Sequence, residues 1–187
     1  GFSDLFDQAF IFLLPNAFLR KLPFSWLGIR PAACVFLGGE RTRSACKTAF
    51  PISEKTSLIW CHAYDYDLYL QASQTAASPR QAKTAVFLDD YMPFHPDVVY
   101  LGRKTPLSAE QYYPVLIAFF EYLETTLGYK MVIAAHPRSE YEKRPDFYKG
   151  RDVIRGKTAE LVKTADLVVT RMSTAINFAV LFNKPLL

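Results

Sequence analysis

The chain has 187 residues, of which 50% are hydrophobic, 15% aromatic and 21% charged. This is the composition of a globular protein, and it excludes a disordered chain, which would be poor in aromatic residues. The formal net charge of +4 comes without any basic run, so charge gives no reason to expect nucleic acid as a partner. The longest apolar stretch, AFIFLLPNAFL, contains Pro15 and falls short of the roughly 20 residues that a membrane-spanning helix needs.

Residues 1–80 are expected to form a partial amino-terminal α/β segment. The patterns predict a short helix in DLFDQAFIFLL, buried strands at 33–37 and 57–60, and a second short helix in YDYDLYLQA. Cys34 and Cys61 lie in or next to the strands, which favours buried, reduced thiols in a cytoplasmic protein. The apolar residues of FIFLLPNAFL and Trp26 are expected to pack into a core. The alternative is that residues 4–19 lie on a membrane surface as an amphipathic anchor.

A polar connector at residues 73–83 is followed by a regular alternation of strands and helices over residues 81–187. Strands are expected at 84–88, 129–135, 152–154 and 166–170, with a fifth beginning in KPLL. Helices are expected from Ser108 to Gly128, at 158–165 and at 173–183. Ser108 and Gln111 form a capping-box pattern at the start of the first of these helices.

This alternation predicts an α/β domain with a Rossmann-like parallel sheet and helices on both faces. The sequence stops where the fifth strand begins, so we expect the sheet to be incomplete at its carboxyl end. The commonest strand order, 3-2-1-4-5, places strand 84–88 beside strand 166–170 and brings Asp89 close to Ser173. Ligands of open α/β sheets bind at this switch point, beyond the carboxyl ends of the strands.

Cations and hydroxyls follow three of the four strands, in the loops HPRSE, RGKT and RMST. The candidate phosphate-binding residues in these loops are His136, Arg138, Lys157, Thr158, Arg171, Ser173 and Thr174. Helix N-termini with free N–H groups bind phosphate, and a hydroxyl at the cap adds a donor. Because a cation at a helix N-terminus opposes the helix dipole, we expect Arg171 to face a phosphate rather than a side chain. Its removal is then expected to leave stability unchanged or to raise it slightly.

Structural roles remain open for several of these residues. Thr158 and Ser173 suit a helix N-cap whatever the ligand, and Arg171 could be a solvated surface residue. His136 could hydrogen-bond to the turn before Pro137. The loop DDYMPFHP after strand 84–88 carries Asp89, Asp90 and His95, and its two aspartates could simply brace it.

Other chemistries lack their motifs. No GxGxxG follows strand 84–88, and the chain has no P-loop and no GxSxG elbow. The histidines and cysteines do not reach zinc-ligand spacing, and DYD at 65–67 lies in a helix pattern, where surface acids are expected. We therefore expect neither a metal nor a required cofactor.

The segments AAHPRSEYE and GKTAELVKTADLVVTRMSTAINFAVLFNKPLL resemble the nucleotide-binding half of bacterial GT-B-fold transferases that build surface polysaccharides. The resemblance covers about residues 81–187 and extends to capsule and O-antigen glycosyltransferases and to teichoic-acid polymerases that use CDP-glycerol. It implies that His136, Ser173 and Thr174 contact the phosphates of the donor. The polymerases usually carry acids where this chain has Arg171 and Asn177, which favours a sugar nucleotide over CDP-glycerol.

The resulting hypothesis is transfer of a sugar from a nucleoside-diphosphate sugar to a glycan or lipid-linked glycan, in the cytoplasm or at the inner face of the membrane. Arg138, Lys157 and Arg171 would neutralise the charge on the departing diphosphate. Asp90 or His95, or a residue of a facing domain, would act as the base. The alternatives are a glycerol-phosphate transferase, a sugar-nucleotide epimerase, or a non-catalytic module that binds a nucleotide or a partner. The oligomeric state is not predicted.

Overall fold

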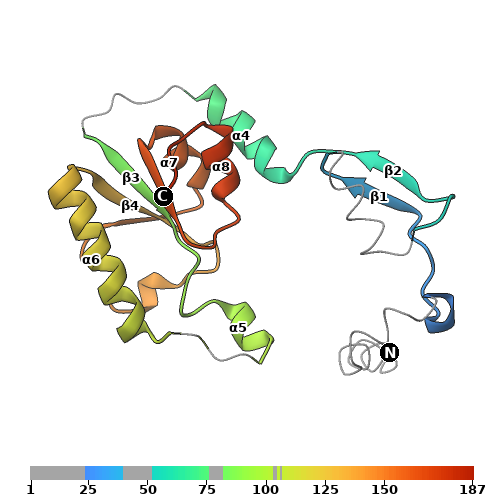
Figure 1. The fold of residues 1–187 in the computed structure, drawn as a ribbon, viewed down its shortest axis with the longest axis horizontal. Helices are drawn as coiled ribbons and strands as arrows, with labels where there is room; N and C mark the ends of the chain where they lie inside the picture. Colours follow the sequence, from blue (N-terminus) through green and yellow to red (C-terminus); the bar gives the residue numbers. More distant parts are fainter. Residues whose placement is uncertain (1–23, 40–51, 76–81, 103–104, 106) are drawn as a thin grey trace. The chain divides into compact units, whose positions relative to one another are not determined.

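The computed structural model describes residues 24–39, 52–75, 82–102, 105 and 107–187 (Figure 1). The chain forms two compact units, residues 1–63 and 64–187. Three sequence predictions lie outside the described residues: the helix in DLFDQAFIFLL, the packing of FIFLLPNAFL and its alternative, an amphipathic membrane anchor at residues 4–19. No helix in the described parts of the chain is long and apolar enough to cross a membrane.

The first unit contains the 3-10 turn η1 (Phe24–Leu27) and a parallel pair of strands, β1 (Cys34–Leu37) and β2 (Ser57–Trp60). Both strands occur where the sequence predicts them, but within them the predicted burial holds only at Leu37. Every residue of β2 is exposed, Trp26 is 79% exposed, and the thiols of Cys34 and Cys61 are free and exposed. Within its described residues this unit has too few elements to cover both faces of the strand pair, so apolar side chains such as Phe36 and Trp60 remain accessible.

The second unit is built on a parallel four-stranded sheet with the order β5-β4-β3-β6. Its strands are β3 (Thr84–Leu88), β4 (Lys130–Ala135), β5 (Asp152–Arg155) and β6 (Leu167–Thr170). A parallel bridge between Val168 and Leu186 adds the start of a further strand beyond β6. The predicted order 3-2-1-4-5 and the α/β fold class are therefore confirmed.

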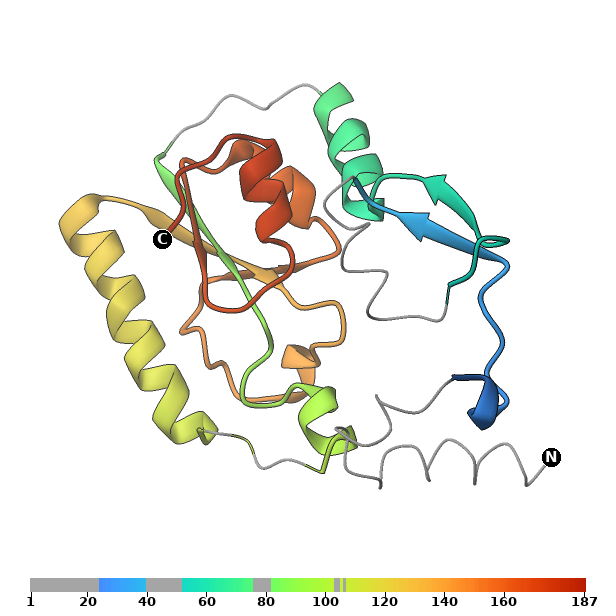
Figure 2. The ribbon, with the colours of Figure 1, turned by 45° about the vertical axis from the view of Figure 1, so that its right-hand side comes forward.

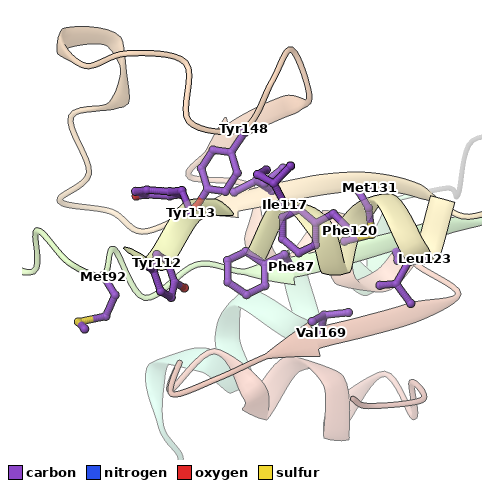
Figure 3. Close-up of a cluster of buried hydrophobic side chains, with 12 residues drawn as sticks. Phe87, Met92, Tyr112, Tyr113, Ile117, Phe120, Leu123, Met131, Tyr148 and Val169 are labelled. Carbon is purple, nitrogen blue, oxygen red and sulfur yellow. The ribbon is translucent and has the colours of Figure 1, made fainter. Parts of the chain in front are cut away.

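Helices cover both faces of this sheet (Figures 1 and 2). The helix α6 (Ala109–Leu127) packs on one face, where its Ile117, Phe120 and Leu123 share a buried cluster with Phe87 of β3 (Figure 3). On the other face the elements are α4 (Tyr64–Gln74), α7 (Thr158–Thr164) and α8 (Ile176–Leu181). Fully burying one large apolar side chain contributes about 1.5–3 kcal/mol, so these two clusters hold the helices against the sheet.

The ends of α6 follow the sequence signals. The Ser108 N–H donates to Gln111 Oε1 at 3.0 Å, and Gly128 stops the helix in the left-handed conformation at φ 69°. Two short elements appear that the sequence analysis did not predict: the helix α5 (Pro96–Tyr100) and the 3-10 turn η2 (Tyr141–Lys143). Proline at the first helical position fixes φ and loses no hydrogen bond, which accounts for the start of α5 directly after His95.

The helix α4 belongs to the second unit and is attached there by polar contacts as well as by packing. Lys163 Nζ of α7 donates to the Ala72 carbonyl at 2.7 Å and also to the Thr75 carbonyl, near the carboxyl end of α4. At the other end, Asn177 Nδ2 of α8 donates to Asp65 Oδ2 at 2.9 Å. The DYD aspartates therefore lie on a helix, as expected, and one of them binds a neighbouring helix.

Candidate functional site

A cavity of about 460 Å³ lies at the carboxyl ends of the strands, and we call it the larger cavity. The loops after the strands contribute polar residues to its wall, which include Asp89, His136, Thr158, Ser173 and Thr174. Helices α4 and α7 add the polar side chains of Asp65, Gln71 and Glu160. Leu68 and Ala72 of α4, Ala159 of α7 and Phe178 of α8 supply its apolar wall. Asp89 and Ser173 thus meet at one cavity, at the switch point where open α/β sheets bind their ligands.

A second cavity, of about 280 Å³, adjoins the first and is called the smaller cavity. Its polar residues are Asp90, His95, His136, Arg171, Ser173 and Thr174. His136, Ser173 and Thr174 line both cavities and therefore form the boundary between them. A ligand longer than one cavity would have to pass these three side chains.

Asp89 is buried, with 2% of its surface exposed, and its carboxylate anchors the loops around both cavities. Oδ1 accepts from the Tyr91 N–H at 2.9 Å and the Tyr148 hydroxyl at 3.2 Å. Oδ2 accepts from the His136 N–H at 3.2 Å and the Tyr141 hydroxyl at 2.9 Å. Burial raises the pKa of Asp89, and the donors oppose that rise. Asp89 therefore holds these loops in place, which is the structural role that the sequence left open for it.

Tyr141 and Tyr148 are structural partners that sequence analysis missed. Burial, followed by the charge of Asp89, raises the pKa of both phenols, so they keep their protons and donate. Their hydroxyls also lie 3.1 Å apart. Both residues come from the aperiodic segment between β4 and β5, and no spacing in that segment signals contact with a carboxylate after β3.

Arg171 forms an ion pair with Asp90, one side-chain nitrogen contacting Asp90 Oδ2. The Asp90 side chain is only 10% exposed, whereas that of Arg171 is 40% exposed. The expectation that Arg171 faces no protein side chain is therefore wrong. Leu88 of β3 lies opposite Thr170 of β6, so the loops that carry Asp90 and Arg171 leave the sheet at the same edge. Because Asp90 Oδ2 is held by Arg171, Asp90 is poorly placed to take a proton from an acceptor.

The two helix N-termini differ from their predictions. The helix α8 begins at Ile176, after the predicted position 173, and Ser173 is not its N-cap. Ser173 Oγ instead accepts from the Ala175 N–H at 3.3 Å, in the turn that precedes the helix. Thr158 is the first residue of α7, and Lys157 occupies the N-cap position. The Ser173 and Thr158 side chains still line the larger cavity, so their hydroxyls are available there without a capping role.

His136 and His95 lie next to each other, with ring centroids 4.9 Å apart in an edge-on arrangement. Burial lowers the pKa of His136, and the neighbouring His95 and Arg138 lower it further. His136 is therefore neutral near pH 7 and can act as a hydrogen-bond donor without carrying charge.

Two of the candidate cations lie away from the cavities. Arg138 pairs with Asp97 at 3.2 Å, with both side chains exposed, and lines neither cavity. Lys157 precedes α7 and also lines neither cavity. Of the seven candidate phosphate-binding residues, the structure brings together His136, Thr158, Arg171, Ser173 and Thr174. Among the described residues, no group of three or more His, Cys, Asp or Glu could hold a metal ion.

No protein-family model matches the chain. No curated protein matches it by sequence. Among solved structures it is similar to KpsC from Thermosulfurimonas dismutans, a beta Kdo 2,4 transferase, at 14% identity and a TM-score of 0.36. The match covers 67% of this chain and 45% of KpsC, so the chain corresponds to less than half of that protein.

Proposed function

We propose that residues 64–187 bind the nucleoside diphosphate of a sugar donor, and that the whole protein transfers the sugar to a glycan or lipid-linked glycan. The observation that carries this proposal is the boundary between the two cavities. His136, Ser173 and Thr174 line both, and each offers a hydrogen-bond donor. Donors at the junction of two cavities suit the phosphates of a ligand that extends into each.

The two cavities differ in a way that fits the two ends of such a donor. The larger one has about 460 Å³ and an apolar wall from α4, α7 and α8, as small-molecule pockets usually have. We assign it to the nucleoside. The smaller one, of about 280 Å³, is lined by imidazoles and by the Asp90–Arg171 pair, and we assign it to the sugar and to the phosphate that carries it. The bond to be broken then lies at the boundary, where Ser173, Thr174 and His136 stabilise the charge that develops on the diphosphate.

No metal or cofactor is part of this proposal, because neutral donors and Arg171 supply the stabilisation. The enzyme would work in the cytoplasm, and at the inner face of the membrane if the acceptor is lipid-linked. Turnover needs the full-length protein, since the facing domain of a two-domain transferase contributes the acceptor site.

Ligand-induced stabilisation tests the proposal on the 187-residue chain. A panel of nucleoside diphosphates and the matching free nucleosides is added, and the unfolding temperature is followed. A ligand at a hundredfold excess over its Kd adds about 2.7 kcal/mol of stability. At least one diphosphate should stabilise the chain, and its free nucleoside should do so less.

Replacing both boundary hydroxyls, Ser173→Ala with Thr174→Ala, should remove most of this effect. The matched control is Thr125→Ala, an exposed hydroxyl on α6 at the opposite face of the sheet. The proposal would be contradicted if no diphosphate stabilised the chain. It would also be contradicted if Thr125→Ala lost as much of the stabilisation as the double variant.

A further inference from the structure

The tripeptide pattern His-Pro-X occurs after both β3 and β4, and the structure builds the two copies alike. In the first, His95 Nδ1 accepts from the Asp97 N–H at 3.2 Å. In the second, His136 Nδ1 accepts from the Arg138 N–H at 3.2 Å. A ring nitrogen that accepts a hydrogen bond carries no proton, so each neutral imidazole carries its proton on Nε2.

The two copies are also tied to each other. The residues at their third positions, Asp97 and Arg138, form an ion pair at 3.2 Å. The two rings lie 4.9 Å apart and both line the smaller cavity. Asp97 Oδ2 lies 3.7 Å from His95 Nδ1, on the side of the ring away from Nε2. The backbone hydrogen bonds fix the orientation of each ring, and the ion pair fixes the two rings relative to each other. The two Nε2–H groups therefore have a fixed separation.

We propose that His95 and His136 act as a pair of Nε2–H donors to one phosphate of the donor nucleotide, so that His95 is a binding residue and not the base. This inference rests on the proposed function and refines it. A base needs an unprotonated nitrogen that faces the acceptor, whereas the unprotonated nitrogen of His95 is occupied by the Asp97 N–H. The sequence hypothesis that His95 takes the acceptor's proton is thereby replaced.

The surroundings of the pair favour an anionic oxygen ligand. Ser173 and Thr174 add hydroxyl donors to the smaller cavity, and Arg171 adds a guanidinium. The one carboxylate that lines this cavity is that of Asp90, and its Oδ2 is held by Arg171. Donors thus outnumber free acceptors. Two rings at this spacing suit two non-bridging oxygens of a single phosphate, which accept without needing to donate.

The test separates a donor from a base by substitution. Asparagine keeps an acceptor near the Nδ1 position but has no donor near Nε2, whereas glutamine places an N–H near Nε2. His95→Asn should weaken binding of UDP or CDP, measured by titration calorimetry, roughly 10- to 100-fold, as expected for a hydrogen bond to a charged group. His95→Gln should recover most of that loss. Affinity for uridine or cytidine should not change, and Thr125→Ala serves as the control.

Imidazole ¹⁵N NMR of the unsubstituted chain gives a second measurement that needs neither ligand nor variant. Both rings should show the Nε2–H tautomer above pH 7.5. A Nδ1–H tautomer for His95, or unchanged diphosphate affinity in His95→Asn, would overturn the inference while leaving the proposed function intact. If neither UDP nor CDP binds, but inorganic pyrophosphate binds and is lost in both His95→Asn and His136→Asn, the paired phosphate site stands and the nucleotide assignment fails. Binding of none of the three would overturn both.

Discussion

Replacing Arg171 with alanine should destabilise the protein, the reverse of what a phosphate-facing cation at a helix start would do. The substitution leaves the Asp90 carboxylate, only 10% exposed, without its cationic partner. Breaking a fully buried pair in this way costs about 3–5 kcal/mol. The Arg171 side chain is 40% exposed, so water screens part of the interaction. We therefore expect a loss of about 1–3 kcal/mol in the free energy of unfolding.

Urea denaturation followed by circular dichroism measures this loss, and a double-mutant cycle assigns it to the pair. Asp90→Asn alone should cost less than Arg171→Ala, because no charge is left buried. Arg171→Ala should then cost little in the Asp90→Asn background, giving a coupling of about 1–2 kcal/mol. The control is Arg138→Ala, whose pair with Asp97 has both side chains about 60% exposed and should change stability by less than about 0.5 kcal/mol. If Arg171→Ala left the free energy of unfolding unchanged or raised it, the stabilising role of the Asp90–Arg171 pair would be refuted.

Three further outcomes follow from the contacts around the cavities. Asp89→Asn should lower the free energy of unfolding, measured by urea denaturation, by about 1–3 kcal/mol. In the wild-type chain two backbone N–H groups donate to the carboxylate, and in the variant one of them would face the amide NH₂. Since the pKa of His136 is lowered on folding, the unfolded chain binds that proton more tightly, so stability should fall as pH drops below about 6.5. His136→Asn should flatten this dependence in unfolding curves taken between pH 5 and 8. Ser173→Ala should change stability by less than about 0.5 kcal/mol, because Ser173 is not a helix cap, while weakening diphosphate binding in calorimetry.

The arrangement of the second unit could be predicted because its signals are local and repeated. Each strand from β3 to β6 is a short apolar run, and α6 carries its own start and stop in Ser108 and Gly128. Strand order then follows from the general preference of alternating α/β chains. That order alone placed Asp89 and Ser173 at one edge of the sheet, where the larger cavity contains both.

Contacts between residues far apart in sequence could not be predicted in the same way. Asp90 and Arg171 are separated by 81 positions, and neither position signals the other. The order β3-β6 places both residues at one edge of the sheet, but the register aligns Arg171 with Asp89 and so does not identify Asp90 as its partner. The tyrosine contacts of Asp89 come from an aperiodic segment, which has no such register.

Helix α4 shows a different limit. The polar connector after it suggested a boundary near residue 80, yet α4 packs against α7 and α8, and the tilted rings of Tyr69 and Phe182 have their centroids 4.8 Å apart. The energy that attaches α4 comes from tertiary contacts such as the Lys163 hydrogen bonds to its carboxyl end. Propensity along a helix gives no information on its partners, so the apolar wall of the larger cavity was missed.

A crystal structure of the chain with a bound nucleoside diphosphate would locate the phosphates directly. The proposed function predicts that they lie within about 3.2 Å of the His136 imidazole and of the Ser173 or Thr174 hydroxyl. The nucleoside should then occupy the larger cavity, against Leu68 and Phe178. Phosphates bound instead at Arg138 or Lys157, outside both cavities, or a nucleotide that leaves the boundary between the cavities untouched, would contradict the assignment of this site.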